Sequence, residues 1–455
     1  MIVPLSIVSL LALVCLGLLA SPFPFLAPGV VLGLVGVAVL YRKPTWGLLG
    51  IAAILPFEGL FKDSAFPGSK ILGASLVLIL MLQLAMHQLP AERLRSNIWR
   101  FLLSFMALYL LSLLNSDNMS VSLGHLRDLS VGLVLFIITL LIGRELNLNT
   151  FAKLVTLSVA VTCAMTLFSV KYQDAGRAAG LLKDPNNFAL MIAFAVPLAL
   201  FLVMRSSNML HRLFWGGCTL LLLVGITKTE SRSGLVVLFI SLLIGAWHYR
   251  ALLPRIRPRH LGFAMLGLAI VIPLALYAMP ASYIKRIESL SILSSGARSQ
   301  DASLGRRASY IVVGSGMIAE NPLIGTGPGT FPLHYAATGY SKAFAFNSNP
   351  EELYRHAHNT YLEIFSELGI PAGLMFVGML GLAMYNLTRA RRAWRQRGNS
   401  EQVDMLTHLS MSFLSLTLFL MFLSAPNHKY LWIMLALTSV LRIKAEESAP
   451  FEARK

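Results

Sequence analysis

Apolar runs recur along this sequence from one end to the other and are separated by mostly short polar links. They lie near residues 3–20, 25–41, 44–56, 71–86, 101–114, 128–143, 151–170, 187–204, 213–226, 233–248, 262–279, 364–387, 406–424 and 430–441. Many approach the roughly 20 residues that an α-helix needs to cross a bilayer, and they lack the alternating pattern of membrane β-strands. The pattern predicts an all-α polytopic membrane bundle of about 12–14 transmembrane helices.

The composition supports this class. Of the 455 residues, 56% are hydrophobic and only 13% are charged, whereas soluble domains carry about a quarter charged residues. Cys15, Cys163 and Cys218 all lie inside apolar runs, so we expect buried thiols rather than disulfides or metal ligands. The first run lacks a basic leader and a small-residue cleavage site, which favours an uncleaved span over a signal peptide.

The net charge of +17 would suggest nucleic acid in a soluble domain, but membrane orientation explains it here. If the N-terminus is cytoplasmic, the links on that side carry about twice as many Lys and Arg residues as the outward links, as the positive-inside rule requires. With this orientation, the chain divides into helices 1–11 with short loops (1–279), a long outward-facing loop (280–361), C-terminal helices (362–445) and a cytoplasmic tail (446–455).

The long outward loop contains predicted structure of its own. Residues 306–320 form an amphipathic pattern that predicts a helix, and a Gly- and Pro-rich turn follows at 321–330. A second helix start is indicated at 349–352, with Asn349 as the N-cap and Pro350 in the first turn. We expect this helix to run directly to His358.

Such a helix would arrange the polar side chains before the next span. Tyr354, His358 and Tyr361 would share one face, and Arg355 and Asn359 would be neighbours at positions i and i+4. A neutral histidine there can accept a proton from an attacking hydroxyl near pH 7. His358 could instead serve only helix packing.

Two other outward links carry basic groups close to lipid. Residues 171–187 contain Arg177 and Lys183 and end in Asp184-Pro-Asn186, which predicts the start of the next span, and residues 227–234 contain Arg232. Guanidinium groups bind phosphate or diphosphate through paired hydrogen bonds. The alternative is that these three cations only anchor the protein at lipid headgroups.

Several further charged groups on the outward side are weaker candidates, for which we favour structural pairing. They are Glu58, Lys62, Asp63, Arg127, Asp128, His428 and Lys429.

Ordered motifs across residues 177–371 resemble the O-antigen ligase and O-antigen polymerase superfamily. They are Arg-x-x-Gly followed by Asp-Pro-Asn-Asn, Thr-Glu-Ser-Arg-Ser-Gly, Arg-Arg-Ala-Ser-Tyr leading to Asn-Pro-Leu-Ile-Gly-Thr-Gly-Pro-Gly-Thr-Phe, and His-Asn-Thr-Tyr-Leu-Glu-Ile-Phe-Ser-Glu-Leu-Gly-Ile-Pro. The last block is the most specific, whereas residues before 150 match only as a hydrophobic pattern.

The resemblance implies a metal-independent glycosyltransferase of the bacterial inner membrane that needs no cofactor, and a direct displacement by the acceptor hydroxyl predicts inversion of the donor's anomeric configuration. It would move a glycan from undecaprenyl diphosphate to an acceptor hydroxyl, such as one on lipid A core, at the periplasmic face. Arg177 and Arg232 would hold the diphosphate, His358 would be the base or orient the acceptor, and the long loop would form a lid. We expect substrate contacts from Lys183, Asn186, Arg306, Arg307, Tyr354, Arg355, Asn359 and Tyr361.

Some choices stay open at this stage. His356 stands two residues before His358, where helical geometry points the two side chains apart, and the Asn neighbour favours His358. The motifs fit a ligase or a polymerase that joins repeat units. A transporter or flippase for lipid-linked glycans is the alternative of another class, and the lack of visible internal repeats favours the enzyme.

Overall fold

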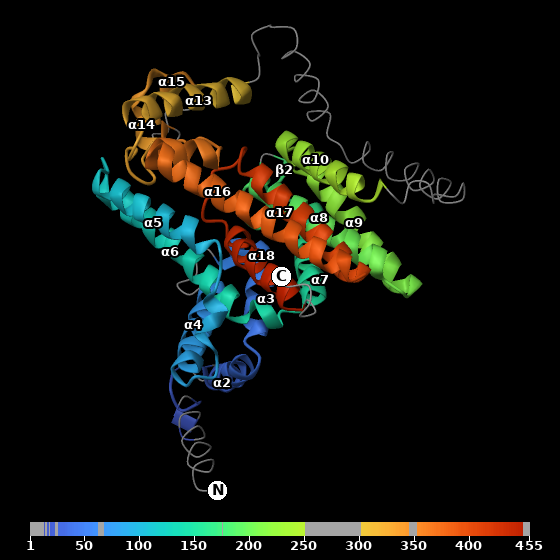
Figure 1. The fold of residues 1–455 in the computed structure, drawn as a ribbon. Coiled ribbons are helices and arrows are strands. Elements are labelled where there is room, and N and C mark those ends of the chain that lie inside the picture. The colour runs from blue at the N-terminus through green and yellow to red at the C-terminus, as the bar shows by residue number, and fades with distance from the viewer. Residues whose placement is uncertain are drawn as a thin grey trace.

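The computed structural model describes residues 13, 16–17, 19–22, 26–61, 68–174, 176–250, 302–344 and 353–448. Figure 1 shows a bundle of helices, in which the sheet found within these ranges is one antiparallel pair, β1 (Gln173–Asp174) and β2 (Arg177–Ala178). The all-α polytopic class is therefore confirmed. The helices are α2 (Leu26–Arg42), α3 (Thr45–Ile54), α4 (Gly68–Ala85), α5 (Trp99–Leu114), α6 (Met119–Ile142), α7 (Leu148–Phe168), α8 (Pro185–Arg205), α9 (Met209–Lys228), α10 (Arg232–His248), α13 (Ala302–Glu320), α14 (Phe331–Ala337), α15 (Gly339–Ala343), α16 (Thr360–Gln396), α17 (Ser400–Phe419) and α18 (Lys429–Glu447).

Within the described residues, 6 helices are long and apolar enough to cross a membrane: α4, α6, α7, α8, α9 and α16. Helices α2 and α3 pass the same test only as a pair, which is bent by 118°. Helices α5 and α10 are apolar but shorter. The predicted spans near 3–20 and 262–279 lie largely or wholly outside the described residues, as does Cys15. Cys163 and Cys218 are free and buried, as predicted.

Helix α18 forms the centre of the bundle, between α16 and α6 (Figure 1). Its residues from Tyr430 to Leu441 are all buried. The Tyr430 ring stacks on Phe194 of α8 at 4.7 Å between ring centroids. Gly132 of α6 gives Trp432 its space, because a Cβ atom there would lie 2.4 Å from the indole nitrogen. A helix that is apolar all round is accommodated by such burial.

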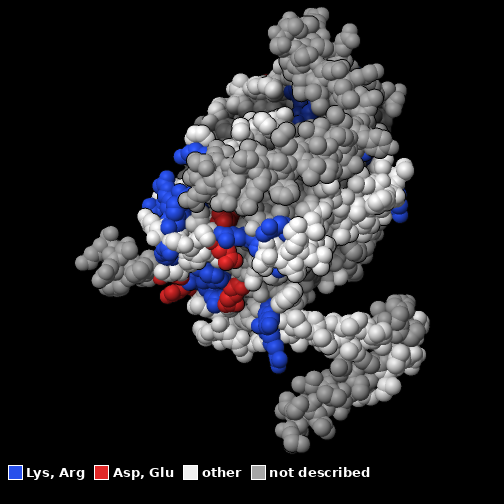
Figure 2. All heavy atoms as spheres, turned by 90° about the vertical axis from the view of Figure 1, so that its right-hand side faces the viewer, with Lys and Arg blue, Asp and Glu red and all other residues white. Residues whose placement is uncertain are grey.

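Links that the sequence places on the same side of the membrane meet at the same end of the bundle. At one end, which we call the ion-pair end, Arg93 pairs with Glu145 at 2.7 Å, Arg144 pairs with Glu447 at 3.0 Å, and Arg205 pairs with Asp404. On the face shown in Figure 2, charged side chains gather in one area and wide described stretches carry none. Uncharged sides are expected of a bundle that contacts lipid.

The opposite end, which we call the cavity end, joins the links 115–118, 169–184, 229–231 and 420–428 to the α13–α15 segment. The backbone N–H of Asp117 donates to the Thr326 carbonyl at 3.2 Å, and the Thr360 N–H donates to the Leu420 carbonyl at 2.8 Å. The predicted polar links thus lie together although they are far apart in the sequence.

Two predictions about the long loop have opposite outcomes. The amphipathic helix predicted at 306–320 is confirmed as α13. The helix predicted to run from 349–352 to His358 is wrong over 354–359, which is not helical, while residues 349–352 lie outside the described residues. His358 has a φ of 48°, and Asn359 instead caps α16 by accepting from the Leu362 N–H at 3.1 Å.

Candidate functional site

Two of the predicted basic links meet at the cavity end. The Arg177 side chain, on β2, donates from Nε to the Thr229 carbonyl at 3.1 Å. The Ser231 hydroxyl donates to Asn186 Oδ1 at 2.9 Å. Ser231 also caps α10, which places Arg232 at the first position of that helix. The structure therefore brings the segments of Arg177, Asn186 and Arg232 together.

The start of α8 was correctly predicted from the sequence. Asp184 is its N-cap and accepts from the backbone N–H groups of Asn186 at 2.8 Å and Asn187 at 3.1 Å. Pro185 takes the first helical position, where a missing N–H costs nothing. Lys183 precedes this cap as an exposed residue with a left-handed φ of 56°.

His358 lies against α13. Its ring centroid is 6.1 Å from that of Tyr310. Burial and the positive charge of Arg307 lower the pKa of His358, and Asp184 partly opposes this effect. The imidazole is therefore neutral near pH 7 and able to accept a proton. Arg307 also lies over the Phe422 ring at 5.8 Å, which ties α13 to the link before α18.

Two more of the predicted arginines, Arg306 and Arg355, act on Tyr310, which lies beside His358. Burial raises the pKa of Tyr310, while the charge of Arg355 and then that of Arg306 act in the opposite direction. Both guanidinium groups therefore lie near the Tyr310 hydroxyl, next to His358. Tyr354 is 53% exposed in the same segment.

The shared helical face predicted for Tyr354, His358 and Tyr361, and the i and i+4 pair predicted for Arg355 and Asn359, are wrong, because residues 354–359 are not helical. The Tyr361 hydroxyl donates to the Thr417 carbonyl of α17 at 2.8 Å, and its ring packs edge-on against Phe376 at 6.0 Å. The side chain of Asn359 is occupied by capping. The physical reason is that Asn is a strong N-cap residue, and its capping bond starts α16 one residue after Asn359.

A cavity of about 460 Å³ lies beside these groups at the cavity end. Glu363, 5% exposed, is its best-connected carboxylate. Its Oε1 atom accepts from the Ala357 N–H at 2.8 Å and from the Ser424 hydroxyl at 2.6 Å, and it lies 3.1 Å from Nδ1 of His356. This hydrogen bond raises the pKa of His356. His356 thus faces Glu363 and the cavity, whereas His358 faces Tyr310.

The structural pairing expected of the weaker candidates is found for Glu58 with Lys429 and for Arg127 with Asp128, but not for His428, whose Nδ1 atom has no hydrogen-bond partner among the described residues. Glu58 forms an ion pair with Lys429 and accepts from the Ser69 hydroxyl at 2.6 Å. Arg127 and Asp128 lie 4.0 Å apart. Lys62 and Asp63 are outside the described residues.

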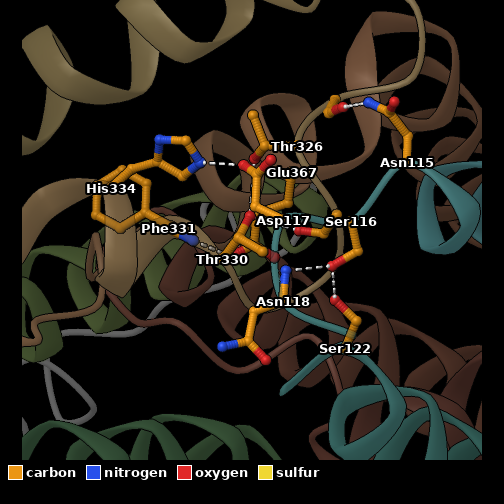
Figure 3. Close-up of polar contacts among 12 residues, drawn as sticks. Asn115, Ser116, Asp117, Asn118, Ser122, Thr326, Thr330, Phe331, His334 and Glu367 are labelled. Carbon is orange, nitrogen blue, oxygen red and sulfur yellow. Dashed lines mark hydrogen bonds and ion pairs between the residues drawn. The ribbon is translucent and has the colours of Figure 1, made fainter. Parts of the chain in front are cut away.

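The glycine-rich turn is held by a second carboxylate of α16, as Figure 3 shows. Glu367 accepts from the backbone N–H groups of Gly329 at 2.8 Å and Phe331 at 3.0 Å. Its own carbonyl accepts from the Gly327 N–H at 2.9 Å. Gly327 and Gly329 have φ values of 106° and 76°, which side chains with a Cβ atom rarely adopt.

The link between α5 and α6 contacts the other side of this turn (Figure 3). The Ser116 hydroxyl of this link contacts the Ser122 hydroxyl of α6 at 2.6 Å. The Ser122 hydroxyl also donates to the Pro328 carbonyl of the turn at 2.7 Å. The Nε2 atom of His334, on α14, lies 2.9 Å from Oδ2 of Asp117. The turn is therefore anchored on two helices, and it joins α13 to the bundle.

Sequence reasoning missed Glu363, Glu367, Ser424 and His125 as members of this region. Glu363 and Glu367 stand inside the most specific motif, and carboxylates within an apolar run are a signal of function or of buried pairing. Ser424 and His125 carry no comparable signal. In the described ranges, no group of three or more His, Cys, Asp or Glu side chains is arranged to hold a metal ion.

These observations define a multi-pass, all-α membrane protein with a polar cavity and several arginines at one end. Residues 217–377 match the family model described as O-antigen ligase. This confirms the resemblance to the O-antigen ligase superfamily and supports a transferase function of that general type. Arg232, Arg307 and His358 lie within the matched segment, while Arg177 precedes it. A comparison with curated proteins finds no match.

Proposed function

We propose that the protein is an O-antigen ligase-like glycosyltransferase of the bacterial inner membrane. It transfers a glycan from undecaprenyl diphosphate to an acceptor hydroxyl, for which lipid A core is our candidate. The cavity end would face the periplasm. The observation that carries the proposal is the junction of the segments of Arg177 and Arg232 at the end of the bundle that also holds His358.

The proposed reaction is a direct displacement. The acceptor hydroxyl attacks the anomeric carbon, the bond from that carbon to the diphosphate oxygen breaks, and the lipid diphosphate leaves with the bonding electrons. His358 takes the hydroxyl proton, for which its lowered pKa supplies the neutral form. Arg177 and Arg232 balance the charge that grows on the diphosphate, so no divalent cation is required.

A single displacement has two consequences for the product. The anomeric configuration of the transferred sugar is inverted, and no covalent glycosyl-enzyme forms. We expect transfer to persist in the presence of a chelator.

The test is a transfer assay with purified protein and a glycan on undecaprenyl diphosphate. One reaction contains lipid A core and another contains only the lipid-linked repeat unit, so that ligase and polymerase products are distinguished. Product stereochemistry is determined by NMR. A retained anomeric configuration, or movement of the donor across a vesicle membrane without a covalent product, contradicts the proposal.

The histidine assignment is tested with two variants. His358→Ala should lose most transfer and keep donor binding, because only the base is removed. His356→Ala should be milder, because the Ala357 N–H still holds the segment to Glu363. An active His358→Ala protein would remove His358 from the mechanism.

A further inference from the structure

The cavity beside His356 has a lining that the proposed diphosphate chemistry does not explain. Four carboxylates line it, from Glu58, Asp128, Glu363 and Glu367, with Lys429 as the one Lys or Arg among its lining residues. The arginines of the proposed diphosphate site are not among those residues. An acidic lining repels an anion, so the diphosphate binds elsewhere.

Several buried polar atoms of this lining lack partners. Among the described residues, Asn187 Oδ1, Asn427 Oδ1 and His428 Nδ1 are buried and form no hydrogen bond within the protein. All three residues line the cavity. Burial and the nearby Lys429 lower the pKa of His428 to about 4, so its imidazole is neutral at pH 7. Buried polar groups are nearly always satisfied, and each that is not costs about 1–3 kcal/mol.

Part of the cavity wall is apolar. Leu55, Ile364 and Pro426 contribute to it. A volume of about 460 Å³ is within the usual range of small-molecule sites, roughly 300–1,000 Å³. The lining therefore combines neutral and anionic hydrogen-bond acceptors with hydrophobic side chains.

We infer that this cavity binds a neutral sugar residue of a glycan substrate. Sugar hydroxyls donate hydrogen bonds to amide, imidazole and carboxylate acceptors, and the C–H faces of the ring pack on apolar side chains. The inference rests on the proposed function, because it assigns the cavity to one of the two glycans in that reaction. The sugar lies on the carboxylate side, and the diphosphate lies on the arginine side.

The first experiment measures binding without transfer. Full-length protein in lipid nanodiscs is titrated with maltotriose, N-acetylated chitotriose and trigalacturonate, and saturation-transfer NMR detects the bound sugar. We expect at least one neutral trisaccharide to bind more tightly than trigalacturonate. Asn187→Leu and Asn427→Leu should each weaken it about threefold to tenfold, the loss expected for one hydrogen bond.

A matched control separates binding from folding. Thr156 Oγ1 of α7 is also buried without a partner among the described residues, but Thr156 does not line the cavity. Thr156→Val should leave sugar binding unchanged. The two Leu variants should unfold at the wild-type temperature or above, because each removes an unsatisfied polar atom. Equal sugar binding by wild type and both Leu variants, or binding of none of the neutral sugars, overturns the inference.

Transfer kinetics then identify the source of the sugar. In the Leu variants, a raised KM for the acceptor alone assigns the cavity to the acceptor glycan, and a raised KM for the lipid-linked donor alone assigns it to the donor. If the wild type shows no transfer at all, the proposed function fails while the binding experiment still decides this inference. Unchanged KM values for both substrates in the Leu variants contradict the inference that the cavity binds a substrate sugar.

Discussion

Replacing Glu363 with glutamine tests the most connected polar group of the site. One carboxylate oxygen accepts from the Ala357 N–H and the Ser424 hydroxyl and contacts His356. Through Ala357 it holds the segment that contains His358, and through Ser424 it holds the link before α18. The Glu363→Gln variant keeps the size and one acceptor oxygen but removes the negative charge.

The expected loss of unfolding free energy in the Glu363→Gln variant follows from these three contacts. Hydrogen bonds to a charged group contribute about 1.5–3 kcal/mol each, against about 0.5–1.5 kcal/mol for neutral pairs. The contacts share one oxygen and are not additive, so we expect a loss of about 1–3 kcal/mol in unfolding free energy. Transfer should fall as well, because the backbone next to His358 loses its charged anchor.

The loss of unfolding free energy in the Glu363→Gln variant should decrease as the pH rises. The hydrogen bond to Glu363 raises the pKa of folded His356 above 6.5. The stabilisation from the His356–Glu363 contact is fully present below the pKa of His356 in the unfolded protein. It disappears as the pH rises through the higher pKa of His356 in the folded protein. The stability difference between wild type and Glu363→Gln should therefore be larger at pH 6 than at pH 9.

The assay is thermal unfolding of purified wild type and variant at both pH values, with transfer measured in parallel. Glu320→Gln, at the exposed end of α13, is the control and should match the wild type. If Glu363→Gln is as stable as the wild type at pH 6, or if the difference is the same at both pH values, the contacts described here do not hold the segment.

Three further predictions concern the arginines, the turn and the topology. Arg177→Lys and Arg232→Lys keep the charge but lose the forked donor, so transfer should fall substantially while membrane insertion, assayed by fractionation, is unchanged; full activity of both would make them headgroup anchors. Gly329→Ala places a Cβ atom 2.3 Å from the His125 ring at a left-handed φ, which costs about 1–2 kcal/mol before the clash, whereas Gly316→Ala meets no atom within 4 Å and should be neutral or stabilising in thermal unfolding. A Ser448→Cys protein should react with a membrane-impermeant thiol reagent only after the cytoplasmic side is opened, and labelling in intact cells would reverse the predicted topology.

The parts of the fold that local chemistry determines were predictable. In the described part of the chain, the apolar runs correspond to helices. Asp184 and Pro185 start α8 as their capping chemistry requires, and the amphipathic pattern at 306–320 appears as α13. The segregation of Lys and Arg predicted which links lie together. These features depend on neighbours within a few turns of the same helix.

The site was less predictable because its contacts join distant segments. A strong N-cap signal at Asn349 favoured a helix through His358, but Asn359 provides a competing cap, and its bond to the Leu362 N–H starts the helix later. Nothing in the sequence indicates that Ser424 reaches Glu363, since 61 residues separate them. The polar character of 171–187 and 227–234 was evident, whereas the bond from Arg177 to the Thr229 carbonyl was not.

The central position of α18 has a consequence for biogenesis. Helices α6, α8 and α16 contact it and are all synthesised before it, so these three helices cannot complete their packing until α18 has been made. A nascent chain that stops before residue 429 leaves the groove at Gly132 open to the bilayer and leaves Glu58 without Lys429. Membrane quality control would encounter such a chain as an incomplete bundle. Completion of the central packing around Trp432, and of the Glu58–Lys429 ion pair at the cavity end, is therefore a late step of maturation.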